Sequence, residues 1–266
     1  FADDGGASYG YIFWVVGRSR VLVDAGGGFF LRFGEALAIF VDLVFVVLSH
    51  FHTDHSADFP ALLKSGNLSG REAPLPVTGP GPGGPFPGLA SWLDSMLAAR
   101  TGAYGYLSGY LDGSGRLVNL VPREIDRDTE EPVNVLQGDI RIDALPVPHG
   151  IVPALGFRIT IGEVSIVFAS DQNGSSDAFT EFAKDASVLV MHFPVPEDAS
   201  GTALQLHARP SRVASIAAEA GAGTLVLSHF MGRSLRDLDG NVDVVRAGYD
   251  GRVVIATDLA CVVVTD

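Results

Sequence analysis

The sequence predicts an α/β sandwich, a fold in which strands and helices pack in layers around a buried core. Short runs of β-branched and apolar residues recur along the whole chain, and segments with helical spacing separate them at intervals. Apolar residues make up 47% of the 266 residues and charged residues only 18%, so the chain can bury a core and is not a disordered polymer. No short-period repeat is present, and we expect residues 1–266 to form a single layered domain.

These patterns place individual strands and helices. Strands are predicted at residues 11–16, 20–24, 44–48, 140–147, 155–161, 164–170, 188–192, 225–229 and 253–257. Helices are predicted at residues 56–64, 89–100, 178–184 and 211–220. Segment 74–88 holds six prolines and five glycines, and segment 102–115 is rich in Gly and Tyr, so both are expected to be loops that shape a pocket. A linker between two domains at 74–88 is the less favoured alternative, because the strand pattern resumes after it.

The charge of the chain bears on its partners. The formal net charge is -13, and lysine occurs only at Lys64 and Lys184. A protein that follows a phosphate backbone uses many flexible cations. We therefore expect no long nucleic acid among the partners, although an acidic surface that serves solubility explains the charge equally well.

Cysteine usage and hydropathy set further limits. The single cysteine, Cys261, excludes an internal disulfide, and its apolar neighbours predict a position in the core. The longest apolar stretch, residues 36–48, is interrupted by Asp42 and is shorter than the ~20 residues that a membrane-spanning helix needs. The chain begins at Phe1 without a visible leader, so the compartment, exported or cytoplasmic, stays open, as does a homodimeric state.

Three histidines and an aspartate lie within the six residues from His50 to His55, directly after a predicted strand of bulky apolar residues. A rigid strand end presents such side chains into a cleft. His50 and His52 point the same way if the chain is still extended there, whereas Asp54 and His55 come from the following turn. Imidazole nitrogen and carboxylate oxygen are ligands that suit Zn²⁺, so the run predicts a metal site. A surface cluster of histidines, or a set of helix-capping residues, is the alternative.

The run His50, His52, Asp54 and His55 matches in full the H-x-H-x-D-H signature, and the sequence therefore resembles the metallo-β-lactamase superfamily. Asp24-Ala25-Gly26 after a predicted strand looks like the family's early Asp-Ala-Gly, an arrangement that supports the metal loop. The resemblance implies a four-layer αββα sandwich and a metal-dependent hydrolase.

Three later motifs extend the resemblance through much of the chain. They are Pro148-His149-Gly150, Ala169-Ser170-Asp171 and Leu227-Ser228-His229. The resemblance implies two zinc ions, or other divalent metals, with two ligand sets. The sets are His50, His52 and His149 for one metal and Asp54, His55 and His229 for the other, with Asp171 shared between them. Taken singly, each later residue also has a structural explanation, as a turn residue, a cap or a hydrogen-bonded core histidine.

Within the superfamily the closer resemblance is to the ribonuclease Z, arylsulfatase and phosphodiesterase branch. Gly79-Pro80-Gly81 follows a short strand as in that branch, and His207 lies 22 positions before His229. A histidine at this spacing assists catalysis in the branch, so His207 is the candidate for stabilising charge or donating a proton. Arg209 stands where the branch usually has Thr, which leaves that role open. His192 stands where the branch often has a His-Glu pair, and it either supports the ligands or is structural.

The resemblance also implies the chemistry, which is attack by a metal-bound hydroxide, with Asp54 as ligand and as acceptor of a hydrogen bond from the attacking water. Ribonuclease Z enzymes commonly carry a long basic arm between the third and fourth ligand motifs. Here the 22 residues from His149 to Asp171 hold only two predicted strands and their turn. We therefore expect a small-molecule ester as substrate, most of all a phosphodiester or aryl sulfate. Lactam or lactone hydrolysis, and a metal-stabilised binding module without turnover, are the alternatives.

Overall fold

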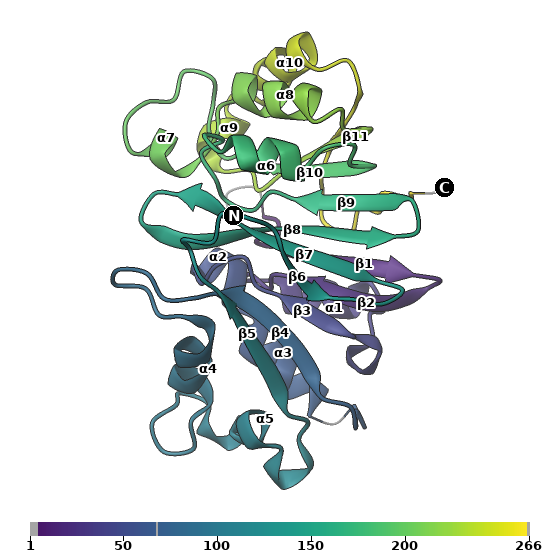
Figure 1. Ribbon diagram of the computed structural model, residues 1–266, viewed down its shortest axis with the longest axis vertical. Helices are drawn as coiled ribbons and strands as arrows, with labels where there is room; N and C mark the ends of the chain where they lie inside the picture. Colours follow the sequence, from purple (N-terminus) through teal and green to yellow (C-terminus); the bar gives the residue numbers. More distant parts are fainter. Residues whose placement is uncertain (1–4, 68, 265–266) are drawn as a thin grey trace. The chain divides into compact units, whose positions relative to one another are not determined.

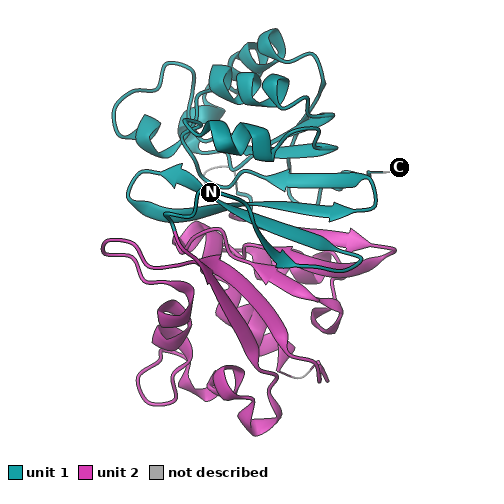
Figure 2. Ribbon diagram, in the orientation of Figure 1, with its two compact units in different colours: residues 1–6, 127–266 teal, residues 7–126 magenta. Residues whose placement is uncertain are grey.

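The computed structural model describes residues 5–67 and 69–264, which fall into two compact units with one β-sheet each (Figures 1 and 2). Unit 1 comprises residues 1–6 and 127–266, and unit 2 comprises residues 7–126. The expectation that residues 1–266 form a single domain stays a prediction, and each unit is described by itself.

The sheet of unit 2 holds five strands in the order of the chain. They are β1 (Tyr11–Val15), β2 (Arg18–Val23), β3 (Phe45–Val47), β4 (Leu75–Pro80) and β5 (Leu120–Ile125). β1 and β2 form an antiparallel hairpin, whereas β2, β3, β4 and β5 pair in parallel. The β-branched residues of β2 and β3 suit this sheet, and those from Val21 to Val23 and from Phe45 to Val47 are buried. The carboxyl ends of the parallel strands consequently meet at one edge.

Helices and tight turns complete the core of unit 2. They are α1 (Phe29–Glu35), η2 (Phe40–Asp42), α2 (Thr53–Ser56), α3 (Phe59–Gly66), α4 (Leu89–Leu97), η3 (Gly105–Leu107), α5 (Gly109–Asp112) and η4 (Ser114–Arg116). Phe59, Leu62 and Leu63 of α3 are fully buried, in the pattern of an amphipathic helix on a sheet. The buried hydroxyl of Tyr110 donates to the Leu63 carbonyl at 2.7 Å, and burial raises the pKa of this phenol to about 12. The segment 102–115 is therefore pinned to the core through short turns.

Two sequence predictions in unit 2 need correction. The single helix predicted at 56–64 is two helices, because Pro60 has no N–H to bond the Ser56 carbonyl and the chain restarts at α3. Segment 74–88 was expected to be irregular over most of its length, with a short strand before Gly79, and the structure extends that strand, β4, through Pro80. β4 tolerates Pro76 and Pro80 because their missing N–H groups fall on the side of β3, which pairs only with Val77 and Thr78.

The sheet of unit 1 holds seven strands in the order β12-β11-β10-β9-β8-β7-β6. Their bounds are β6 (Val133–Leu136), β7 (Arg141–His149), β8 (Val152–Ile161), β9 (Val164–Phe168), β10 (Val188–His192), β11 (Thr224–Ser228) and β12 (Arg252–Ile255). β6 to β9 form an antiparallel meander, and β9, β10, β11 and β12 pair in parallel. β8 and β9 are joined by a two-residue turn, which confirms the expected hairpin between the third and fourth ligand motifs.

Helices gather on one face of this sheet, as Figure 1 shows for α6, α8 and α10. The helices of unit 1 are α6 (Asp177–Phe182), α7 (Ala203–Leu206), α8 (Pro210–Glu219), α9 (Gly232–Leu235) and α10 (Leu238–Gly248). α10 was not predicted, because Gly240 and Gly248 lower its helical propensity. It forms because Val242 and Val245 are buried and because Gly248 allows a close approach to α8, where a Cβ would lie 3.0 Å from Ala214 Cβ.

The end of the chain departs from the expected core position of Cys261. β12 ends at Ile255, the following residues have no regular structure, and Cys261 is exposed. The apolar residues 260–264 do not form a strand, and no strand of the described residues pairs with them, so their apolar character did not lead to burial of Cys261. Among the described residues, no helix is both long and apolar enough to cross a membrane.

If residues 1–266 form a single domain, a destabilising substitution in the core of unit 1 should also lower the denaturant concentration at which unit 2 unfolds. Leu189 is fully buried in unit 1, and both tryptophans of the chain, Trp14 and Trp92, lie in unit 2. Leu189→Ala should destabilise by about 2–5 kcal/mol, as large-to-small core substitutions do. We expect urea unfolding followed by tryptophan fluorescence to shift to a lower midpoint. An unchanged fluorescence midpoint, together with an earlier loss of far-UV circular dichroism, would show that the units unfold separately.

Candidate metal centre

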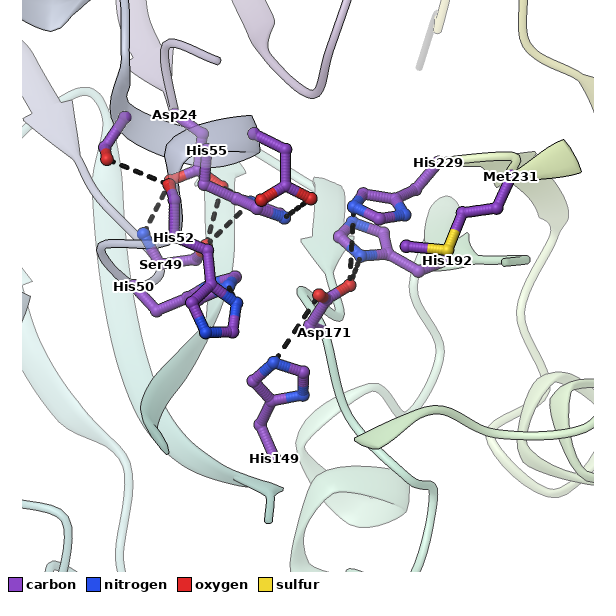
Figure 3. A network of polar contacts seen from close by, with 12 residues as sticks. Asp24, Ser49, His50, His52, His55, His149, Asp171, His192, His229 and Met231 are labelled. Carbon is purple, nitrogen blue, oxygen red and sulfur yellow. Dashed lines mark hydrogen bonds and ion pairs between the residues drawn. The ribbon is translucent and has the colours of Figure 1, made fainter. Parts of the chain in front are cut away.

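The histidine run of unit 2 lies just after β3, at the edge where the parallel strands end. His50 and His55 are buried, whereas His52 and Asp54 are partly exposed. His50 Nε2 lies 3.0 Å from His52 Nδ1, and the ring centroids of His50 and His55 are 4.0 Å apart. His55 Nε2 lies 3.8 Å from Asp54 Oδ2. His50, His52 and His55 thus lie together (Figure 3), and Asp54 lies beside His55.

Asp24, directly after β2, holds this run in place. Its fully buried carboxylate accepts hydrogen bonds from the Ser49 amide at 2.6 Å, from the Ser49 hydroxyl at 2.6 Å and from His55 Nδ1 at 2.8 Å (Figure 3). A histidine that binds a metal through one nitrogen commonly donates its other N–H to such a carboxylate. Asp24 therefore fixes the His55 ring with Nε2 directed toward Asp54.

The residues after Asp24 bring the two segments into backbone contact. The Ala25 amide donates to the His55 carbonyl at 2.7 Å. A Cβ at Gly26 would lie 1.9 Å from the Asp54 carbonyl oxygen, so only glycine fits there. Asp24 itself has φ of 57°, a strained conformation for a non-glycine residue. The Asp24-Ala25-Gly26 segment thus supports the backbone of the candidate metal loop through contacts with Ser49, Asp54 and His55.

In unit 1 the chemistry-bearing residues lie at the carboxyl ends of four strands of one sheet, β9, β10 and β11, which are neighbours, and β7, which is separated from β9 by β8. His149 ends β7 and His192 ends β10, while Asp171 and His229 follow β9 and β11. These four strands run in the same direction, so their ends meet at one edge of the sheet. Ser170 and His229 have φ of 58° and 56°, which turns the chain sharply at the strand ends.

The buried carboxylate of Asp171 is the centre of this group (Figure 3). Asp171 Oδ1 lies 2.5 Å from His192 Nδ1 and 3.7 Å from His229 Nε2. Asp171 Oδ2 lies 3.6 Å from His149 Nε2. The predicted residues His149, Asp171 and His229 are therefore brought together within unit 1.

Histidine orientation in unit 1 is also set by hydrogen bonds. His149 Nδ1 lies 2.9 Å from the Leu206 carbonyl, so the ring donates there and leaves Nε2 directed toward Asp171. His207 is buried, and its Nδ1 lies 3.6 Å from Asp171 Oδ1. Burial lowers the pKa of His207 to about 4, against the opposing effect of Asp171, with His229, His149 and Arg233 lowering it further. The His207 ring is therefore neutral near pH 7 and presents one N–H and one bare nitrogen.

His192 is the member of this group that the sequence did not assign as a ligand. Its Nδ1 is the donor nearest to Asp171, and its ring stacks on that of His229 with centroids 4.6 Å apart. The ligand atoms of Asp171, His192 and His229 all lie within 4.8 Å of one another. The signal that identifies it is the placement of β10 between two parallel strands that each carry a ligand candidate at the same end.

Both donor sets fit a divalent metal ion. Each unit supplies imidazole nitrogens and carboxylate oxygens, the mixture that zinc and similar ions take. Ligand atoms around one tetrahedral zinc are about 3.4 Å apart when each lies about 2.1 Å from the ion. The separations of 3.0 Å in unit 2 and of 3.6 and 3.7 Å in unit 1 are close to that value.

The comparisons with known proteins identify the family. Residues 19–230 match the model described as "Beta-lactamase superfamily domain". This match covers most of the chain, and the protein therefore belongs to the metallo-β-lactamase superfamily and is a metal-dependent hydrolase of that superfamily.

Individual relatives agree with this assignment. Ribonuclease Z of Mycobacterium bovis is 29% identical over 227 residues, which are 81% of this chain and 77% of that protein. The crystal structure of the metallo-β-lactamase fold protein YhfI from Bacillus subtilis superposes with a TM-score of 0.72 at 24% identity, covering 96% of this chain and 90% of that one. The short form of human tRNase Z gives a TM-score of 0.71 at 18% identity, covering 96% and 95%. The predicted α/β fold of the metallo-β-lactamase type is thus confirmed.

The expectation of no long nucleic acid conflicts with the mycobacterial relatives, which are named ribonuclease Z. The expectation rested on the net charge of the whole chain and on one missing arm. Net charge describes the average surface, whereas binding of a substrate depends on the groups around the reacting bond. The short β8–β9 connection stands, but it does not remove RNA from the candidate substrates.

The contacts of Asp24 predict that it controls metal affinity without binding metal. Asp24→Asn keeps only one acceptor oxygen, so the side chain cannot accept from both the Ser49 amide, which bonds Oδ1, and His55, which bonds Oδ2, and the His55 ring loses its orientation. We expect zinc affinity to fall about 10- to 100-fold, as for other residues that orient a ligand. Asp58→Asn is the matched control, because Asp58 accepts from the Phe30 amide in the same unit and touches no signature histidine. Equal affinities of the two variants in a competitive chelator titration would contradict this role.

Proposed function

We propose that the protein hydrolyses phosphodiester bonds with two divalent metal ions, zinc being the leading candidate. The observation that carries the proposal is the buried Asp171 carboxylate, which has histidine nitrogens at 2.5, 3.6 and 3.7 Å. The proposed ligands are His50, His52, Asp54, His55, His149, Asp171 and His229. His192 is added to them as a residue that binds metal or positions Asp171. The choice of a phosphodiester is supported by the relatives named ribonuclease Z.

A pair of bound divalent ions lowers the pKa of water and offsets negative charge in the transition state. The protein's own groups complete the chemistry. Asp54 is partly exposed and accepts a hydrogen bond from the attacking water, which orients it. His207 is buried beside Asp171, and its neutral ring donates a hydrogen bond to a phosphoryl or leaving-group oxygen.

RNA is the leading substrate class, because the relatives that match four fifths of the chain are named ribonuclease Z. A small phosphodiester is the second candidate. It is favoured by the two-residue turn between β8 and β9, which leaves no long arm there to hold a large substrate. Aryl sulfates, lactones and β-lactams share the same metal chemistry and serve as comparison substrates.

The proposal predicts loss of both metal and activity when one ligand is removed. His52→Ala and Asp171→Ala should each lower the rate more than the ~100-fold that loss of an orienting residue costs. The measurements are metal content and hydrolysis of an RNA with a 3′ extension, bis-(p-nitrophenyl) phosphate, p-nitrophenyl sulfate, a lactone and a β-lactam. Phosphodiesterase activity that survives in both variants would refute the site. A wild-type protein that cleaves only the sulfate, the lactone or the lactam would refute the substrate class.

A second prediction separates His207 from the ligands. His207→Gln should lower kcat by about 10²- to 10³-fold, the range for loss of one positioned hydrogen-bond donor to transition-state charge, with metal content unchanged. His192→Gln, in contrast, should lower metal content, since His192 contacts Asp171 at 2.5 Å. If His207→Gln loses metal to the same extent, His207 is a ligand or a structural residue instead.

A further inference from the structure

One aromatic ring beside the histidine run has no part in the proposed chemistry. The ring of Phe86 meets that of His52 edge-to-face, with centroids 6.3 Å apart and planes inclined at 69°. Both residues belong to unit 2, and both are partly exposed. Phe86 therefore offers an aromatic surface next to a proposed ligand.

The hairpin that carries Phe86 is rigid. Gly83 and Phe86 exchange two backbone hydrogen bonds, of 3.1 and 3.0 Å, and Pro85 and Pro87 restrict the backbone on either side. Gly84 at the tip has φ of 56°, which a tight turn requires.

The base of the hairpin is fixed to the end of β5. The Gly81 amide donates to the Ile125 carbonyl at 2.8 Å. The Glu124 carboxylate accepts from the Ala90 amide at 2.8 Å, and a Cβ at Gly88 would lie 2.5 Å from that carboxylate. The position of Phe86 is consequently set by the backbone before any ligand binds.

Core packing does not explain Phe86. By contrast, the rings of Phe51 and Trp92 stack with centroids 4.7 Å apart, and both pack against the core of unit 2. Phe86 is not among the described residues that pack against this core. A half-exposed aromatic ring held by a rigid backbone instead of by the core is typical of a recognition element.

We propose that Phe86 stacks on the nucleobase of the substrate and thereby selects nucleotidyl phosphodiesters over esters without a base. The inference rests on the proposed phosphodiesterase function and adds the substrate class. Aromatic side chains bind the faces of bases of any identity. Residues 82–88 contain no charged or hydrogen-bonding side chain, so the hairpin recognises the face of the base and not its edge. The phosphate would lie toward His52 and the base against Phe86.

Direct binding tests this inference without turnover. The probes are adenosine 5′-monophosphate and ribose 5-phosphate, which differ only by the base, titrated into zinc-loaded protein by calorimetry. We expect Phe86→Ala to weaken binding of the adenosine nucleotide about tenfold, in the range of stacking on one aromatic side chain, and to leave ribose 5-phosphate unchanged. Phe86→Trp should retain the affinity for the nucleotide. Tyr106→Ala, which removes a 65% exposed aromatic ring of the same unit, is the matched control and should change neither affinity.

Two results would overturn the inference. One is equal weakening of both probes by Phe86→Ala, which would mean that Phe86 only supports His52. The other is a wild-type protein that does not distinguish the two probes. Failure of the proposed function is seen separately, as absence of phosphodiester hydrolysis by a protein that still binds the nucleotide through its base.

Discussion

The buried carboxylate of Asp24 is the interaction on which the candidate metal loop depends. A carboxylate removed from water is unfavourable unless hydrogen bonds satisfy it. Here the Ser49 amide, the Ser49 hydroxyl and the His55 ring all donate to it. The same bonds that satisfy the charge fix the loop and aim His55. Gly26 lies against the Asp54 carbonyl, and this contact together with the hydrogen bonds of Asp24 holds the strained backbone of Asp24 in place. One set of contacts at Asp24 therefore satisfies the buried charge, stabilises the strained backbone and orients the His55 ring.

In unit 1 the candidate ligands are brought together by the common direction of the strands that precede them. β9, β10 and β11 are parallel neighbours, and each delivers one polar side chain to the same edge: Asp171, His192 and His229. Three strands fixed by backbone hydrogen bonds position these groups more firmly than a loop does. The Leu206 carbonyl adds the orientation of His149. A buried carboxylate surrounded by imidazoles is a costly arrangement for folding alone, and this cost supports our proposal that the group binds metal.

The sequence predicted the strands and helices well where the hydrophobic pattern of a segment matches its packing in the fold, and poorly where the two differ. The strand 188–192 was predicted to the residue, and the hairpin of β8 and β9 nearly so. The prolines of β4 obscured its strand pattern, and only the resemblance indicated a short strand before Gly79; the missing N–H donors matter only where a neighbouring strand needs them. α10 was not predicted because its glycines lower its helical propensity, although one of them, Gly248, allows the close packing of α8. The apolar segment around Cys261 led to the opposite error: it was predicted to lie in the core, whereas Cys261 is exposed.

The sequence by itself determined the class of protein and the identity of the candidate ligands. Histidine and aspartate at fixed spacing after apolar strands indicate metal-binding chemistry, because ligand type and position at a strand end can be inferred from the local sequence. Only the tertiary structure decided the position of His192 beside Asp171 and of Phe86 beside His52. These pairs are separated along the chain, and their contacts depend on strand order and on how one rigid hairpin is anchored. Such distances are set by packing and backbone hydrogen bonds across the sheet, which a local pattern does not contain.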